Sequence, residues 1–249
     1  SVDETKVDAI AVLDTHAMGM NLRQTRLLAT CAIPMKVKWI AAERLGEEEL
    51  GDVFVEDGRL VASMERTYAG RVIDNRQDVP EGPLAWQALL RLIVAGKLFR
   101  AEIAQSRDNF DTARLWHALE KGDLVDASAI WEDIPPETRV EGEFESWLEN
   151  RVENLGFDSG EDLALMSAED LLFPELPQSA GEWLERRYPL KFSAEEDRYL
   201  AIYEVTKRRV IVEHVSGRRK DPPSAFFLPS FPGLRIEMNH RGRRIVLRH

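Results

Sequence analysis

The sequence predicts an α+β protein in which two antiparallel β-meanders flank a central helical bundle. Apolar residues alternate in short runs before residue 81, recur at helical spacing up to residue 188, and then alternate again. Because strands and helices are segregated along the chain, the pattern favours α+β over an alternating α/β sheet. We expect a β-rich segment at 1–80, a helical segment at 81–188 and a basic β-rich segment at 189–249. Together they form one or two compact domains.

The first segment is predicted to hold a meander of four or five antiparallel strands over residues 27–75, after a short strand at 10–13. Its strongest signal is the pair Asp57-Gly58, which supplies the positive φ that a tight hairpin turn needs. Leu27 to Ile33 is an apolar run that ends before a proline, as a buried strand does. The expected strands of the meander are 27–33, 38–43, 52–56, 59–67 and 70–74.

Six or seven short helices are predicted between Gly82 and Tyr188. In the first, apolar residues recur every three or four positions from Leu84 onward, and the helix ends near Gly96 or runs on to Gln105. The next is expected to start at an N-cap, Asp108 or Asn109, and to close at Gly122. Further helices are expected to start at Asp123, to run through Phe144 and Val152, to start at Ser159 and at Ser167, and to span Ala180 to Arg187.

The last segment returns to a period of two residues, which predicts a second antiparallel meander. A basic loop rich in glycine and proline runs from Ser216 to Ser224, and Asn239 to Arg243 has the composition of a turn. The expected strands are 190–192, 199–205, 210–215, 234–238 and 244–248.

Charge is distributed unevenly along the chain. The formal net charge is −11, yet Thr206 to His249 carries 11 lysines and arginines against three acids, a net charge of +8. Residues 1–205 therefore carry −19. Such asymmetry predicts an anionic partner for the basic end, RNA or single-stranded nucleic acid, or else docking of that end on the acidic remainder. No apolar run reaches the roughly 18–20 residues of a membrane span, so no membrane partner is expected.

Motifs that carry catalysis are not found in the sequence. It contains no phosphate-binding P-loop, no Gly-x-Gly-x-x-Gly and no Gly-x-Ser-x-Gly. No two histidines are spaced i, i+4, and His214 is expected on the opposite strand face from its acidic neighbour Glu213. Cys31 lies in an apolar run, typical of a small core residue. We therefore expect no catalytic residue, metal ligand or cofactor, and no enzyme activity of the chain by itself.

Two basic strings near the C-terminus are the candidate site. One lies in the loop that precedes Phe226-Phe227, and the other on the predicted turn around Gly242. Arginines at loop tips beside aromatic residues suit contact with a phosphate backbone and stacking of bases, although basic hairpins also serve to block edge pairing. The expected nucleic-acid contacts are Arg218, Arg219, Lys220, Arg241, Arg243 and Arg244.

Over roughly residues 27–248, the layout and several strings resemble the C-terminal region of HrpB-type DEAH-box helicases, a bacterial family of ATP-dependent RNA helicase-like proteins. The resemblance lies in the strings Ala32-Ile33-Pro34, Gly46 to Leu50, Arg66 to Ile73, Pro80 to Leu92, Tyr188-Pro189-Leu190, and Ile236 to Val246. The Pro/Gly-rich end that follows the last hairpin in the family is missing. So are the phosphate loop, the DEAH box and the arginine finger.

The resemblance implies a non-catalytic, cytoplasmic accessory module that guides RNA or positions a partner. The chain would then be a piece of such a helicase or a stand-alone relative without the motor. Two alternatives remain open. One is an interaction or scaffold module that binds a basic partner through the acidic helical stretch from Glu141 to Glu153. The other is an enzyme of a kind that the sequence does not reveal. Exposed edges of the two sheets also allow pairing between chains.

Overall fold

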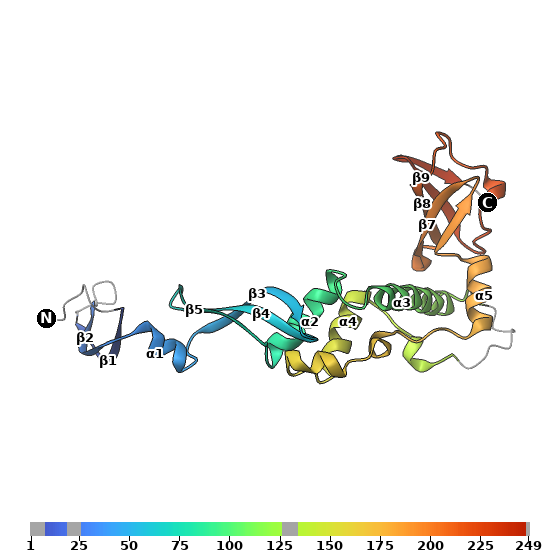
Figure 1. Ribbon diagram of the computed structural model, residues 1–249. Helices are drawn as coiled ribbons and strands as arrows, with labels where there is room; N and C mark the ends of the chain where they lie inside the picture. The colour runs from blue at the N-terminus through green and yellow to red at the C-terminus, as the bar shows by residue number, and fades with distance from the viewer. Residues whose placement is uncertain (1–7, 19–25, 126–133, 248–249) are drawn as a thin grey trace. The chain divides into compact units, whose positions relative to one another are not determined.

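The computed structural model describes residues 8–18, 26–125 and 134–247 (Figure 1). Strands lie at both ends of the chain and the helices between them, which confirms the predicted α+β class. The chain forms two compact units. Unit 1 comprises residues 1–98 and 152–166, and unit 2 comprises residues 99–151 and 167–249. Among the described residues, no helix is long and apolar enough to cross a membrane.

Unit 1 contains two separate antiparallel sheets instead of the one meander expected at 27–75. In the three-stranded sheet, the central strand β4 is paired with β3 on one side and β5 on the other, and it buries Leu60, Ala62 and Met64. The elements are β1 (Ala9–Met18) paired with β2 (Arg26–Met35), α1 (Val37–Ala42), the sheet β3 (Glu47–Glu56), β4 (Arg59–Tyr68) and β5 (Arg71–Asp78), α2 (Pro83–Val94) and η3 (Gly160–Leu165).

The strand predicted at 38–43 is wrong, because this segment is the helix α1. Only Ile40 is buried in it, whereas a strand with one buried face would bury every second residue. Two alanines in the last turn favour a helix. The hairpin predicted at Asp57-Gly58 is confirmed, and both residues have positive φ, 50° and 77°.

In unit 2, the long helix α3 (Arg100–Lys121) corrects the predicted start at Asp108 or Asn109. It starts directly after Phe99, which has a φ of 50°, and it has no break at residues 108 or 109. The two expected N-cap residues make tertiary contacts instead. Asp108 pairs with Lys191 at 2.7 Å, and the Asn109 amide donates to the Phe173 carbonyl at 3.0 Å. The predicted end at Gly122 is confirmed.

The other helices follow the predicted order. Short helices start at Ser159 and Ser167 as expected. Both are 3₁₀ turns, and both serines are N-caps with capping boxes. Most of the helix expected after Asp123 lies outside the described residues. The remaining elements of unit 2 are η2 (Pro136–Thr138), α4 (Phe144–Asn154), which continues into unit 1, η4 (Ala168–Leu171) and α5 (Gln178–Arg187).

Unit 2 ends in a five-stranded sheet of order β10-β9-β8-β7-β6. One hydrophobic cluster joins its inner face to α3 and α5, with the rings of Trp116 and Trp183 5.7 Å apart. The strands are β6 (Lys191–Ala194), β7 (Asp197–Glu204), β8 (Arg209–Ser216), β9 (Arg235–His240) and β10 (Arg243–Leu247), and the short turns η5 (Val205–Lys207) and η6 (Ala225–Phe227) lie between them.

The expectation of a purely antiparallel C-terminal meander is wrong at one pair, because β8 and β9 run parallel. A parallel pair cannot be joined by a tight turn. Residues 217–234 therefore return along the length of the sheet before β9 begins. As a result, β8 and β9 both finish at the same end of the sheet, where β7 and β10 begin. We call this end the Gly217 end and the opposite one the Arg209 end.

Candidate nucleic-acid interface

Three connections meet at the Gly217 end of the sheet: the β6–β7 turn, the start of the loop after β8, and the β9–β10 turn. Arg241 links two of them, since its Nη2 donates to the carbonyl oxygen of Gly217 at 2.9 Å. Arg241 thus contacts the residue directly before the other basic string, which starts more than 20 positions earlier in the sequence.

The loop after β8 is anchored by two carboxylates. Asp197 accepts a hydrogen bond from the backbone N–H of Arg219 at 3.4 Å. Glu195 accepts from the backbone N–H of Ser224 at 3.3 Å and pairs with the Arg219 guanidinium at 3.3 Å. Gly217 lies so close to Asp197 that a Cβ there would collide with the carboxylate. The loop is therefore held at both ends of its basic string.

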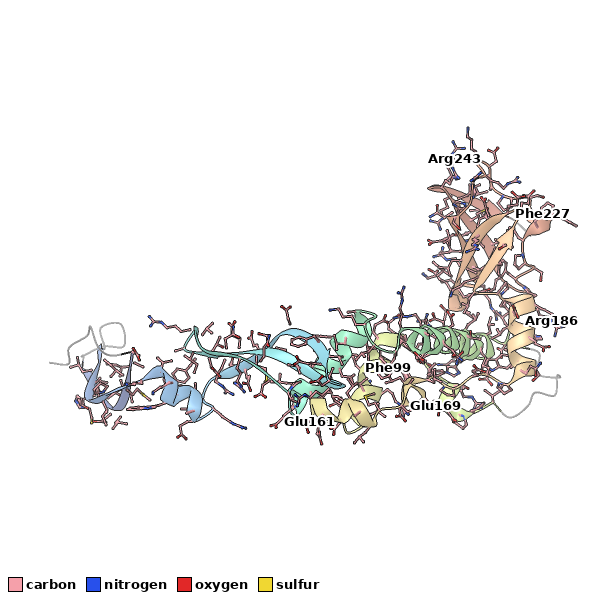
Figure 2. The ribbon with its side chains drawn as sticks, viewed as in Figure 1. Phe99, Glu161, Glu169, Arg186, Phe227 and Arg243 are labelled. Atoms are coloured by element: carbon pink, nitrogen blue, oxygen red, sulfur yellow. The ribbon has the colours of Figure 1, made fainter. Side chains whose placement is uncertain are left out.

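Exposed cations surround these anchors. Arg218, Lys220 and Arg243 are exposed, and Figure 2 shows Arg243 at the free end of the C-terminal sheet. Arg198 adds a further cation that sequence reasoning missed, since it is exposed and paired in register with Ser216. Its signal was the alternation of β7, in which its neighbours on both sides are buried.

Arg244 has a different environment from the other predicted contacts. Its guanidinium pairs with Glu237, whose side chain is 2 % exposed, and Arg235 and Arg209 pair with the same carboxylate. The hydrogen bond from Arg244 is the largest influence on the pKa of Glu237, which is lowered although burial opposes the shift. Arg244 is therefore paired with the buried Glu237, which lies on the face of the sheet opposite His240.

Two aromatic side chains follow the basic loop. Phe226 is 88 % exposed and Phe227 is 51 % exposed, with ring centroids 5.5 Å apart. The side chain of Ser224 caps their 3₁₀ turn. Phe227 also lines a hollow of about 460 Å³ together with Arg186 and Lys191, and Figure 2 labels Phe227 and Arg186. Cationic and aromatic groups therefore share this part of unit 2.

Beneath the loop, the structure gathers a group that the sequence did not predict. Asp197, His214 and His240 each place a potential metal-ligating atom within 4.8 Å of the other two. Nε2 of His214 lies 3.0 Å from Oδ2 of Asp197. Burial alone would raise the pKa of Asp197, but the hydrogen bonds from the Arg219 N–H and from His214 outweigh it and lower the pKa. The group was missed because it forms across three strands, not within one helix.

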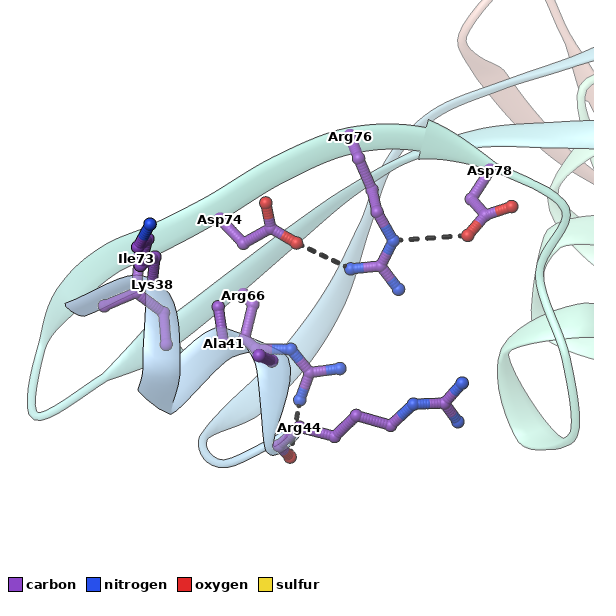
Figure 3. A pocket seen from close by; sticks show the side chains of 9 residues that line it. Lys38, Ala41, Arg44, Arg66, Ile73, Asp74, Arg76 and Asp78 are labelled. Carbon is purple, nitrogen blue, oxygen red and sulfur yellow. Dashed lines mark hydrogen bonds and ion pairs between the residues drawn. The ribbon is translucent and has the colours of Figure 1, made fainter. Parts of the chain in front are cut away.

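A second charged hollow, of about 440 Å³, lies in unit 1 between α1, β4 and β5 (Figure 3). Arg76 in its wall contacts Asp74 at 2.8 Å, Asp78 at 3.2 Å and Glu48 at 2.7 Å. Arg66 contacts the same Glu48 at 3.0 Å. Because these carboxylates already hold both guanidinium groups, the hollow is less suited to an anion than the Gly217 end.

Comparison of the chain with protein-family models, with curated proteins and with solved structures gave no match.

Proposed function

We propose that unit 2 binds single-stranded RNA at the Gly217 end of its sheet. The observation that carries the proposal is Phe226, a ring that is 88 % exposed and that directly follows an anchored loop with three basic residues. An exposed aromatic ring on the same connection as basic residues suits stacking of a base, with the basic residues contacting phosphates.

The anchoring of the loop after β8 favours RNA binding. Arg219 and Arg241 hold it through Glu195 and the Gly217 carbonyl, which leaves Arg218, Lys220 and Arg243 exposed for phosphates. A loop that is already ordered loses less conformational entropy when a ligand binds. Arg198 extends the cationic surface along β7.

In this proposal the chain is a non-catalytic accessory module of an HrpB-like DEAH-box helicase. That link rests on the resemblance of the sequence alone. In such a helicase, other parts of the protein would form the motor, and this chain would guide the RNA.

The salt dependence of RNA binding tests the proposal directly. A fluorescently labelled oligouridylate of about 12 nucleotides is titrated with the chain at several NaCl concentrations, and anisotropy is recorded. Four to five phosphate contacts predict a slope of roughly −3 to −3.5 in log affinity against log salt. Absence of binding at low salt overturns the proposal.

A pair of matched variants locates the site. Replacing Arg218→Ala and Lys220→Ala together removes two exposed charges and is expected to make the slope shallower by about 1.4. The control, Lys207→Ala with Arg208→Ala, removes the same charge at the Arg209 end, where both residues line another hollow of about 900 Å³. If the control weakens binding as much as the first variant, the Gly217 end is not the interface.

The alternative of a scaffold that binds a basic partner through residues 141–153 stays a prediction. Three of its acids already pair within unit 2: Glu141 with Lys121, Glu143 with Arg114 at 3.6 Å, and Glu145 with Arg107 at 2.7 Å. These pairs reduce the negative charge that the stretch offers to a partner.

A further inference from the structure

Asp197, His214 and His240 lie on the core-facing side of the C-terminal sheet, at its Gly217 end. They come from three neighbouring strands, β7, β8 and β9. Each lies two positions along its strand from a buried residue, Tyr199, Val212 or Met238, and so points to the same face of the sheet. Asp197 and His240 are each 1 % exposed, and the His214 side chain is 10 % exposed. Three ionisable side chains thus occupy the end of an otherwise apolar layer.

The pairings among these residues leave one buried nitrogen unsatisfied. Nε2 of His214 contacts Asp197, and Nδ1 of His240 lies 3.3 Å from the Tyr199 hydroxyl. Among the described residues, Nε2 of His240 is buried and has no hydrogen-bond partner. A buried polar atom without a partner is costly, so its retention calls for an explanation such as an ion.

The donor set and its spacing suit a transition metal. Two imidazoles and one carboxylate match the three protein ligands of zinc sites that keep one position for water, whereas Ca²⁺ and Mg²⁺ prefer oxygen ligands. Tetrahedral Zn²⁺ with bonds of about 2.0–2.1 Å separates its ligand atoms by about 3.4 Å. The three atoms here already lie within 4.8 Å of one another, so rotamer adjustments of about 1.4 Å or less close the site.

The second nitrogen of His240 also fits this arrangement. A metal-bound histidine normally donates its other ring N–H to a polar partner, which fixes the tautomer and the ring orientation. The Tyr199 hydroxyl occupies that position beside Nδ1. Ligation through Nε2 would therefore satisfy both nitrogens of His240 at once.

We propose that Asp197, His214 and His240 bind a divalent transition-metal ion, with Zn²⁺ the best fit, and that Tyr199 orients His240 from behind. The ion would join β7, β8 and β9 at the base of the basic loop, because Asp197 also receives the Arg219 N–H. The proposed metal site does not depend on whether the loop binds RNA.

Zinc titration of the untagged, chelator-treated full chain against a chromophoric chelator tests the proposal. One Zn²⁺ per chain is expected. The double variant His214→Ala with His240→Ala should weaken binding by about 100-fold or more, and Tyr199→Phe by about 10- to 100-fold. His16→Ala, at an exposed histidine of β1, is the control and should leave the affinity unchanged. Equal affinity in the double variant, or no binding by the unaltered chain, overturns the proposal.

A second measurement needs no variant and so does not depend on whether the variants fold. Co²⁺ added to the unaltered chain should give the intense visible absorption of a four- or five-coordinate ion, and stoichiometric Zn²⁺ should abolish it. Excess Ca²⁺ should not abolish it. A weak spectrum typical of six-coordinate, hydrated Co²⁺ overturns the proposal.

Discussion

Nη2 of Arg241 donates a hydrogen bond to the carbonyl oxygen of Gly217 at 2.9 Å. This contact joins the turn between β9 and β10 to the loop that follows β8. It holds the two basic strings near each other. Gly217 in turn packs against Asp197. One glycine therefore contacts both the cationic surface and the buried Asp-His-His group.

Replacing Gly217→Ala is expected to disturb this junction. The residue has a φ of +140°, and an added Cβ would collide with the Asp197 carboxylate, so backbone strain and steric clash both act. We expect the free energy of unfolding to fall by about 1–3 kcal/mol in urea titrations. The control is Gly142→Ala, at a φ of +86° with open space around the added carbon, which meets backbone strain alone. If the two variants are equally stable, the close packing of Gly217 on Asp197 does not contribute to the free energy of unfolding.

Replacing Phe226→Ala is expected to weaken binding of the labelled oligouridylate by about 10-fold, since stacking one base contributes about 1–3 kcal/mol. The melting temperature should not change, because the ring is 88 % exposed. Leu165→Ala, which removes a side chain that is 83 % exposed, is the control and should leave both quantities unchanged. Unchanged RNA affinity in the Phe226 variant would exclude stacking at this position.

Replacing Ser106→Ala is expected to destabilise the helical part of unit 2. Ser106 is fully buried in α3, and its Oγ accepts the backbone N–H of Phe173 at 2.9 Å. Its loss leaves a buried donor unpaired, at a cost of about 1–3 kcal/mol. Calorimetry or urea unfolding measures the effect, with the exposed Ser146→Ala in α4 as the control. A Ser106 variant as stable as the Ser146 variant contradicts this role.

Acidification is expected to remove a stabilising contribution of Glu204. Hydrogen bonds from Arg209, at 2.5 Å, and from Lys207 lower the pKa of this carboxyl from 4.5 to about 2. Because the folded-state pKa is depressed, the contribution is fully present above the unfolded-state pKa and is lost as the pH falls toward about 2. The difference in unfolding free energy between the unaltered chain and Glu204→Gln should therefore shrink between pH 5 and pH 2. A difference that is constant over this range would show that the pairs do not couple to folding.

Local patterns in the sequence predicted most elements because local physics determines them. Asp57-Gly58 makes the expected hairpin since both residues adopt positive φ, and Ser159 caps a helix because Asp162 completes its capping box. Predictions were wrong where tertiary partners compete with local preference. Asp108 is the clearest case, since it pairs with Lys191 in the sheet instead of capping a helix.

For the candidate site too, some features follow from the sequence and others only from the tertiary structure. The sequence by itself determined that its last 44 residues are basic, that their strands alternate, and that arginines occupy a loop and a turn. Only the tertiary structure decided that the loop and the turn meet. An antiparallel β9 of six residues would have placed Arg241 about 20 Å from Gly217, at the other end of the sheet. The parallel pairing of β8 with β9 brings Arg241 to Gly217 and His240 to His214. Strand direction depends on contacts between distant segments, which periodicity within one strand does not encode.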